Sequence, residues 1–267
     1  MLHILTLNWN GKEKLKELYP SLIKSLSNID YHWYIRDHNS NDGSQLLNDE
    51  WQNDKVSIIR YHTNKENFSQ GCTWLFNEAK PSPDDYVMLL NNDVVFNDTT
   101  SISNMISLFE KDADIGVVGA RLLYKDTNKL QHAGVIFVPG YKTPTHFRAH
   151  EVADDLSKQN REFQAITGAV LITKAKYFQM DSNLIWAFDD VDMCMTIKFD
   201  MHKKIVYCGN TNIFHEESAS LKKNPVNKMF LKHNLQYFLT KWKDRYQIDQ
   251  EAYITNPKHN LYIGPNK

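Results

Sequence analysis

The feature that most restricts the fold of this chain is the short run Val87-Met88-Leu89-Leu90, followed at once by Asn91-Asn92-Asp93. Four consecutive apolar residues leave no polar face, which is typical of a strand covered on both sides of a sheet. Polar groups after such a strand emerge where open α/β proteins bind their ligands. Asp93 is therefore a candidate metal ligand and Asn91 a candidate partner for a ligand hydroxyl, although Asn and Asp are also common in simple turns.

Strand-like and helix-like segments alternate through the first half of the chain. Leucines at 15, 18, 22 and 26 recur at helical spacing, and Pro20 inside this pattern predicts a kink or a late start of the helix. A second helix is expected over 68–79. The strand-like segments are 3–7, 32–36, 56–61 and the run that ends at Asp93. This alternation predicts an α/β fold with a Rossmann-like, mostly parallel mixed sheet flanked by helices.

The second half of the chain is less regular. Residues 139–162 carry many charged side chains and few apolar ones, which predicts an irregular excursion. The simplest division of the chain is a catalytic domain over 1–221, with a C-terminal helical extension over 222–267 packed on it. Strands are expected over 115–123, 134–138, 165–173 and 205–208, and helices over 190–201 and 226–242.

Composition restricts the partners and the compartment. A net charge of -1 over 267 residues gives no overall attraction to nucleic acid, so no nucleic-acid partner is expected. The three cysteines lack metal-type spacing, and no apolar run approaches the roughly 18 residues that a membrane span needs. Together with the lack of a signal-like segment, these features predict a cytoplasmic protein.

A polar segment, Asp37-His38-Asn39-Ser40-Asn41-Asp42-Gly43-Ser44, follows the second expected strand. At a strand-to-helix junction such residues can hydrogen-bond a ligand, and a carboxylate can accept the ring N–H of uracil or thymine. A turn with a helix N-cap explains the same residues equally well, because Asp-Gly is a frequent turn pair. Both interpretations stay open on the sequence.

Three carboxylates stand close together in Trp186-Ala187-Phe188-Asp189-Asp190-Val191-Asp192. Like charges and partial burial raise a carboxylate pKa, which suits a general base. Asp190 is the candidate base and Asp189 its neighbour in substrate binding, whereas Asp192 is expected to be structural. Capping of the following helix is the alternative, because acidic residues favour the first turn of a helix.

A histidine closes the strand-like stretch Ile213-Phe214-His215. A single histidine is usually a surface or core residue that binds nothing. Together with Asp93, however, His215 offers a mixed oxygen and nitrogen site for Mn²⁺ or Mg²⁺.

Taken in order, these segments resemble the motifs of glycosyltransferase family 2. The resemblance covers residues 3 to about 243 and is greatest to the bacterial rhamnosyltransferase-like branch, through Leu89-Leu90-Asn91-Asn92-Asp93. It implies the GT-A fold and inverting transfer of a sugar from a nucleoside diphosphate. The matching series is Asn8-Trp9-Asn10, then Asp37-x-Asn39-Ser40-x-Asp42-Gly43-Ser44, Asn91-x-Asp93, Asp189-Asp190-x-Asp192 and His215.

The resemblance also implies roles for individual residues. Asp190 matches the aspartate that deprotonates the acceptor hydroxyl, and Asp93 and His215 match metal ligands. Asp37 would contact the nucleobase and Asn91 the ribose. Contacts to the donor nucleotide are implied for Asn8, Asn10, Asp37, Asn39, Asn91 and Asn92. Contacts to the donor sugar or the acceptor are expected for Gly168, Trp186, Asp189, His146 and Arg148, although a solvated surface loop is the alternative for the last two.

Four positions depart from the family pattern. Asn91 replaces a carboxylate, but an amide can still bind a ribose hydroxyl. Asp189 replaces the usual glutamate, whose reach is longer. Asn67 replaces a glycine, and asparagine is among the few residues that tolerate a left-handed backbone. Arg36, directly before Asp37, has no explanation in the sequence.

The expected protein is a metal-dependent inverting glycosyltransferase. It would move rhamnose or a similar hexose from a dTDP- or UDP-linked donor to a hydroxyl of a glycan or lipid-linked saccharide. The alternatives are a non-catalytic nucleotide-sugar- or carbohydrate-binding protein on a decayed transferase fold, and a sugar nucleotidyltransferase, whose glycine-rich loop is missing here. A dehydrogenase is disfavoured because no G-x-G-x-x-G follows any strand.

The C-terminal segment Lys222–Arg245 is basic, with seven Lys or Arg and one acidic residue. Such a composition suits peripheral contact with the inner face of a membrane, where lipid-linked acceptors reside. A helix packed on the catalytic domain, with a solvated basic face, is the simpler expectation, because the apolar stripe is no wider than a core-facing helix needs.

Overall fold

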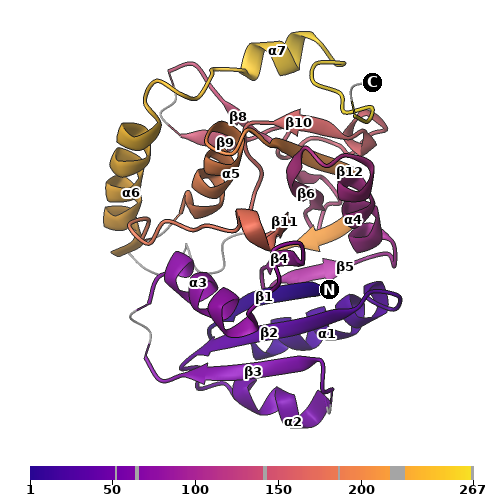
Figure 1. Ribbon diagram of the computed structural model, residues 1–267, viewed down its shortest axis with the longest axis vertical. Helices are drawn as coiled ribbons and strands as arrows, with labels where there is room; N and C mark the ends of the chain where they lie inside the picture. Colours follow the sequence, from indigo (N-terminus) through magenta and orange to yellow (C-terminus); the bar gives the residue numbers. More distant parts are fainter. Residues whose placement is uncertain (52, 64–65, 141–142, 186, 217–225, 266–267) are drawn as a thin grey trace.

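In the computed structural model, the chain forms a ten-stranded mixed sheet with helices on both faces (Figure 1). The structure describes residues 1–267 apart from 52, 64–65, 141–142, 186, 217–225 and 266–267. The strands of this sheet are β1 (Leu2–Asn8), β2 (Tyr31–His38), β3 (Val56–Tyr61), β4 (Tyr86–Leu90), β5 (Val94–Phe96), β6 (Ile115–Leu123), β7 (Leu130–His132), β10 (Arg161–Phe163), β11 (Val170–Lys174) and β12 (Lys204–His215).

A small second sheet pairs β8 (Val135–Phe137) with β9 (Pro144–His146) in antiparallel fashion. The helices are α1 (Lys12–Ser25), α2 (Leu47–Trp51), α3 (Phe68–Ala79), α4 (Ser101–Lys111), α5 (Asp189–Phe199), α6 (Val226–Trp242) and α7 (Gln250–Thr255), with short 3₁₀ turns η1 (Ser44–Leu46), η2 (Leu156–Lys158) and η3 (Ala175–Tyr177).

The strand order, β10-β12-β6-β11-β4-β1-β2-β3, brings many strand ends to one edge of the sheet. Strands β1, β2, β3 and β4 are parallel, with Asn8 opposite Asp37. Strand β11 runs antiparallel to β4 with Val170 opposite Leu90, so the segment that enters β11 lies at the same edge. The end of β12 pairs with β5, which starts just after Asp93, and places His215 opposite Val94.

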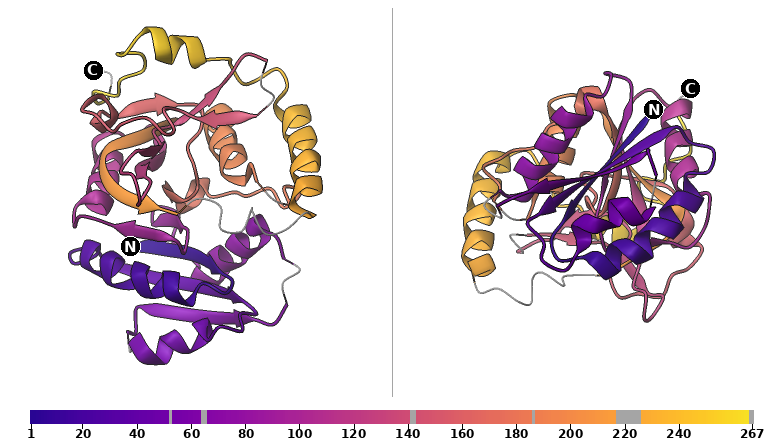
Figure 2. Two further views of the ribbon diagram at one scale, coloured as in Figure 1. Left: turned by 180° about the vertical axis from the view of Figure 1, so that it is seen from behind. Right: turned by 90° about the horizontal axis from the view of Figure 1, so that it is seen from below.

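Both faces of the sheet are covered, and each face has its own core. In β4, Met88 and Leu90 belong to the core beneath α1 and α4, whereas Val87 and Leu89 belong to the core beneath α3 and α5. Figure 2 shows α1 lying across β1 and β2 on the face opposite α3. This arrangement explains the run of four apolar residues, because side chains alternate between two buried faces.

Most sequence predictions for the parallel half are confirmed, some with the same bounds. Strand β3, strand β6, helix α3 and helix α6 begin and end where expected. Helix α1 starts at Lys12 and continues through Pro20, so the predicted late start is wrong. Asn67 is not left-handed: its φ is -82°, and its side chain caps α3 by accepting from the Gln70 N–H.

Three predicted strands differ from the observed ones by three or more residues at one end. The strand before Asp93 ends at Leu90, because the polar triplet forms a turn. The strand expected over 165–173 begins only at Val170. The strand expected over 205–208 continues to His215, past an irregularity between Cys208 and Ile213, and the polar residues there concealed the continuation. Helices α4 and α7 were not predicted.

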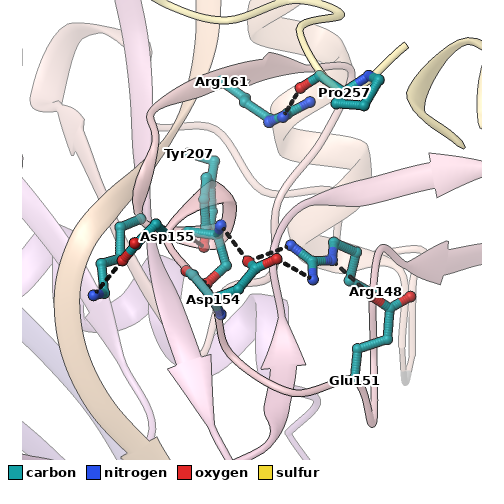
Figure 3. A network of polar contacts seen from close by, with 9 residues as sticks. Arg148, Glu151, Asp154, Asp155, Arg161, Tyr207 and Pro257 are labelled. Atoms are coloured by element: carbon teal, nitrogen blue, oxygen red, sulfur yellow. Dashed lines mark hydrogen bonds and ion pairs between the residues drawn. The ribbon is translucent and has the colours of Figure 1, made fainter. Parts of the chain in front are cut away.

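The 139–162 segment is not the irregular excursion that its composition predicts. It contains β9, η2 and the start of β10. Figure 3 shows Arg148 held by Glu151 and Asp154, at 2.7 and 2.8 Å. The Tyr207 hydroxyl donates to the Ser157 carbonyl at 2.6 Å and so fixes η2 against β12. Charged side chains that pair within the segment stabilise it without an apolar core of its own.

Helix α6 packs beside α5, on the α3 face of the sheet (Figure 1). Phe238 and Trp242 are buried, and the Trp242 indole N–H donates to Asp192 at 2.7 Å. Lys241 pairs with Asp181 and Asp192 at 2.9 Å. These contacts agree with a helix packed on the domain; the predicted boundary at 221/222 lies outside the described residues. Within the described ranges, no helix is both long and apolar enough to cross a bilayer.

Candidate active site

The ends of β1 and β2 are joined by a buried polar network. The Asn8 amide donates to Asp37 at 2.9 Å, and the Ser40 N–H donates to the other Asp37 oxygen at 3.1 Å. The Asn92 amide donates to the side-chain oxygen Oδ1 of Asn8 at 2.8 Å, which extends the network to the turn after β4. Asp37 is fully buried, so its proposed contact with a nucleobase remains a prediction.

Asn10 and Asn39 shape the two turns that frame this network. Both have positive φ, 47° and 56°, in the left-handed region that asparagine tolerates better than most residues. Asn10 accepts from the Asn41 N–H at 2.9 Å, and Asn39 accepts from Arg60 at 3.2 Å. Between Asn8 and Asn10, Trp9 is 59% exposed, and its aromatic face is available to a base or a sugar ring. Trp9 belongs to the motif Asn8-Trp9-Asn10, but no role for it was predicted from the sequence.

Asp93 and His215 meet at the same edge. His215 Nε2 lies 3.2 Å from Asp93 Oδ1 and 3.2 Å from the Asn91 amide. The Gln131 amide N–H donates to the His215 carbonyl at 3.2 Å, so its Oε1, 2.6 Å from His215 Nδ1, accepts the ring proton there. This contact fixes the ring with Nε2 toward Asp93. Such orientation by a neighbouring group is typical of metal-binding histidines.

This arrangement fits a divalent cation. Asp93 Oδ1 and His215 Nε2 lie 3.2 Å apart, and a carboxylate oxygen beside an imidazole nitrogen is a ligand pair that Mn²⁺ or a similar cation accepts. Among the described residues, no group of three or more His, Cys, Asp or Glu side chains comes together. The remaining ligands of a cation would therefore come from a substrate phosphate and from water.

The charge of Asp93 is stabilised in place. Burial alone would raise the pKa of Asp93, but the His215 ring and the Lys14 ammonium outweigh burial and lower it. Lys14 lies 3.5 Å from Asp93 Oδ2. The carboxylate therefore stays ionised, as a metal ligand requires. Lys14 and Gln131 are further site residues that the sequence analysis missed, because neither belongs to a motif.

Asp190 is held by backbone N–H groups. Its Oδ2 accepts from the Gly168 N–H at 2.6 Å, and its Oδ1 accepts from the Val191 N–H at 2.8 Å. A Cβ atom on Gly168 would lie 2.9 Å from the Asp190 Cβ, which real contacts do not allow. The structure thus gives Gly168 a direct reason to be glycine, because Asp190 packs against it.

The same backbone segment connects Asp190 to the cation site. One residue after Gly168, the Ala169 carbonyl accepts from the Asn91 N–H at 2.9 Å. The Asn91 side chain in turn contacts His215. Hydrogen bonds through Gly168, Ala169 and Asn91 thus connect Asp190 to the pair formed by Asp93 and His215.

The two aspartates beside Asp190 have different surroundings. Asp189 is buried and accepts from the Ser69 hydroxyl at 2.5 Å. Burial, with the negative charge of Asp190 added, raises the pKa of Asp189 to about 7 despite the Ser69 hydrogen bond. Asp192 accepts from Trp242 and Lys241, which confirms its structural role.

The turn before these aspartates is strained and supported by α6. Ala187 and Phe188 have φ of 70° and 69°, a conformation that costs non-glycine residues free energy. The buried Asn234 of α6 accepts from the Ile185 N–H at 3.1 Å and donates to the Ala187 carbonyl at 3.1 Å. Helix α6 therefore helps to present Asp189 and Asp190. Trp186, also predicted for this site, lies outside the described residues.

The predicted acceptor residues divide into two groups. His146 Nδ1 lies 3.1 Å from His132 Nδ1, and His132 Nε2 accepts from the Thr167 N–H at 3.4 Å, one residue before Gly168. Burial lowers the pKa of His132 well below its ordinary value, so this ring is neutral. His146 is therefore connected to the site. The Arg148 guanidinium instead pairs with Glu151 and Asp154 within its own segment and is only 13% exposed, so its contact with the donor sugar or the acceptor stays a prediction.

The structure accounts for Arg36. Its guanidinium lies between the rings of Tyr61 and Trp74, at 4.0 and 3.8 Å from their centroids, and donates to both oxygens of Glu66 at 2.7 and 3.2 Å. Arg36 thereby ties β2 to the end of β3 and to α3. Its role is to hold together the elements that carry the polar strand ends.

The chain has the GT-A fold: a mixed sheet is covered by helices on both faces, and polar residues and aspartates follow its strand ends. A family model described as glycosyl transferase family 2 matches residues 4–206, and the chain belongs to this family. A search of curated protein sequences gave no significant match.

Solved structures of glycosyltransferases share the fold. GalNAc-T7 with UDP, GalNAc and Mn²⁺ matches with a TM-score of 0.63 and 12% identity over 98% of this chain and 54% of its own. The mannosyltransferase PcManGT from Pyrobaculum calidifontis, with GDP-Man and Mn²⁺, has a TM-score of 0.63 and 11% identity over 95% and 69%. TarS 1-349 of S. aureus, with UDP-GlcNAc, has a TM-score of 0.63 and 10% identity over 96% and 72%. The chain thus spans about half of the first of these proteins, and identities this low show the fold alone.

Proposed function

We propose that this chain is an inverting, metal-dependent glycosyltransferase. It would move a hexose, rhamnose or a similar sugar, from a nucleoside diphosphate to a hydroxyl of a saccharide or lipid-linked saccharide. The observation that carries the proposal is the connection from Asp190 through Gly168 and Ala169 to Asn91, His215 and Asp93. A base close to a cation site is what a single displacement at an anomeric carbon needs.

The donor would lie across the ends of β1, β2 and β4. Asn8, Asn10, Asp37, Asn39 and Asn92 form the hydrogen-bonded floor of this region. Asp37 favours a uracil or thymine base, so UDP- and dTDP-linked donors are the first candidates. A divalent cation held by Asp93 and His215, with Asn91 beside it, would neutralise charge on the leaving diphosphate.

Asp190 would act on the acceptor. Its half-buried carboxylate is oriented by the Gly168 and Val191 N–H groups and would take the proton of the acceptor hydroxyl. The activated oxygen would then attack the anomeric carbon on the face opposite the diphosphate, which inverts its configuration. Asp189 is buried and largely protonated below pH 7, so the neighbouring carboxylates are set to different tasks by their surroundings. His146 and His132 would border the acceptor side.

The first experiment is a thermal-shift panel of UDP-, dTDP- and GDP-linked sugars with Mn²⁺ or Mg²⁺. A ligand that binds the folded state raises apparent stability by an amount set by its concentration over its Kd. The donors that bind are then tested for transfer to saccharide acceptors and for slow hydrolysis without acceptor.

The decisive variant is Asp190→Asn, which should bind the donor normally and lower turnover about 10²–10⁴-fold. Asp155→Asn is the matched control, because the Asp155 carboxylate is 96% exposed and pairs with Lys158 rather than with a site residue. Wild-type turnover in Asp190→Asn would remove Asp190 as the base. Donor binding without any turnover in the wild-type protein would instead favour the non-catalytic alternative.

A further inference from the structure

Lys14 is a cation already present at the proposed metal site. It belongs to the first turn of α1, and its ammonium lies 3.5 Å from Asp93 Oδ2 and 3.2 Å from Glu216 Oε2. The other Asp93 oxygen faces His215. The carboxylate that would bind a metal is therefore already paired with a positive charge.

The charges around the site predict that a divalent ion binds only weakly when no nucleotide is present. Asp93 supplies one negative charge, which Lys14 balances, and Asn91 supplies none where the family pattern has a carboxylate. Glu216 adds a second carboxylate, but its side chain is 66% exposed and it too contacts Lys14. A cation that binds Asp93 must therefore displace Lys14 or tolerate its repulsion.

A nucleoside diphosphate would change this balance. Phosphate oxygens attract a lysine ammonium, which acts toward them as a point charge. They also favour the first turn of a helix, where the N–H groups carry partial positive charge. Gly11, just before α1, has no Cβ, and an added one would lie 2.4 Å from both Asn8 and Asn92. The start of α1 is thus packed directly against the donor-binding strand ends.

We propose that Lys14 exchanges partners, from Asp93 and Glu216 in the free protein to the diphosphate in the complex, and so makes cation binding depend on the nucleotide. This inference rests on the proposed function, because it assumes a nucleoside diphosphate ligand. Without nucleotide, Lys14 competes with the cation for Asp93. With nucleotide bound, Lys14 has left Asp93, and the cation binds without that competition.

The exchange predicts opposite effects on the two ligands in Lys14→Met. Mn²⁺ alone should bind about tenfold tighter, because the competing ammonium is gone, as expected for a part-buried ion pair. Mn²⁺ at saturating UDP should bind as in the wild type. UDP at saturating Mn²⁺ should bind about tenfold more weakly, because its lysine contact is lost. The factor by which each ligand tightens the binding of the other therefore falls about tenfold, whichever of the two is titrated.

The measurements are Mn²⁺ titrations followed by electron paramagnetic resonance and UDP or dTDP titrations by calorimetry, on the full chain. Lys16→Met is the matched control: Lys16 belongs to the same helix, is 41% exposed and lies 4.0 Å from Glu50. It should leave every affinity unchanged. Lys14→Arg keeps the charge and should restore the dependence on nucleotide, which separates this role from a general effect on folding.

The outcomes distinguish the two proposals. If wild-type protein binds neither UDP nor dTDP at any Mn²⁺ concentration, the proposed function and this inference fail together. If nucleotide and Mn²⁺ bind but Lys14→Met leaves the affinity for Mn²⁺ alone unchanged, only the role of Lys14 is refuted. Equal wild-type affinity for Mn²⁺ with and without nucleotide refutes it as well.

Discussion

Replacing Asp189 by asparagine should remove a pH-dependent loss of stability that this buried carboxyl causes. The Asp189 pKa is 3.8 in an unperturbed carboxyl and about 7 in the folded protein, where burial and the charge of Asp190 disfavour ionisation. Between these values the folded state holds a proton that the unfolded state has lost, so the free energy of unfolding falls as pH rises. Each pKa unit corresponds to about 1.4 kcal/mol, so the full loss above pH 7 is about 4 kcal/mol.

Asparagine keeps the shape of the side chain and an oxygen that can accept from the Ser69 hydroxyl, but it cannot ionise. Asp189→Asn should therefore match the wild type near pH 4 and exceed its stability progressively from pH 5 to pH 8. The assay is urea unfolding followed by circular dichroism at several pH values. Asp155→Asn, at an exposed carboxylate, should leave the pH dependence unchanged. A constant difference between Asp189→Asn and wild type from pH 4 to pH 8 would show that Asp189 is ionised in the folded protein.

Two further predictions concern residues that support the site. Gln131→Leu should leave the His215 ring unoriented and lower the affinity for Mn²⁺ about 10–100-fold at saturating UDP. Circular dichroism should show that the fold is intact. An unchanged affinity for Mn²⁺ would exclude the orienting role of Gln131. Asn234→Ala should lower the free energy of unfolding by about 1–3 kcal/mol and reduce kcat more than donor KM, because the turn that carries Asp189 and Asp190 loses two hydrogen bonds. Urea unfolding and steady-state kinetics test it, and a normal kcat would confine Asn234 to stability.

The three neighbouring aspartates illustrate how the fold separates similar side chains. Asp189 is enclosed next to Ser69, Asp190 is held by backbone N–H groups at the open edge, and Asp192 anchors α6. In the first turn of α5 they point in different directions, so one sequence motif supplies a neutral acid, a candidate base and a structural anchor. Capping of α5 by itself would need only one of these three aspartates.

Sequence patterns predict the strands of the parallel half and, with the family resemblance, the candidate site residues at their ends. Alternating apolar segments predicted β1 to β4 with their helices, because two buried faces demand the continuous run before Asn91. The family resemblance implied that Asn8, Asp37 and Asp93 serve one donor site, and the shared edge of the parallel strands is the physical reason that they lie near one another. Local patterns failed where polar residues interrupt β12 and where ion pairs replace an apolar core in the 139–162 segment.

The residues that support the motifs become visible in the folded chain and not in the sequence. Gln131 meets His215, Lys14 meets Asp93, and Asn234 holds the turn before Asp189. Each of these pairs joins segments from different parts of the chain, and each depends on strand register and helix placement rather than on a local pattern. Periodicity records which side of an element is buried, but it carries no information on which distant side chain lies against it.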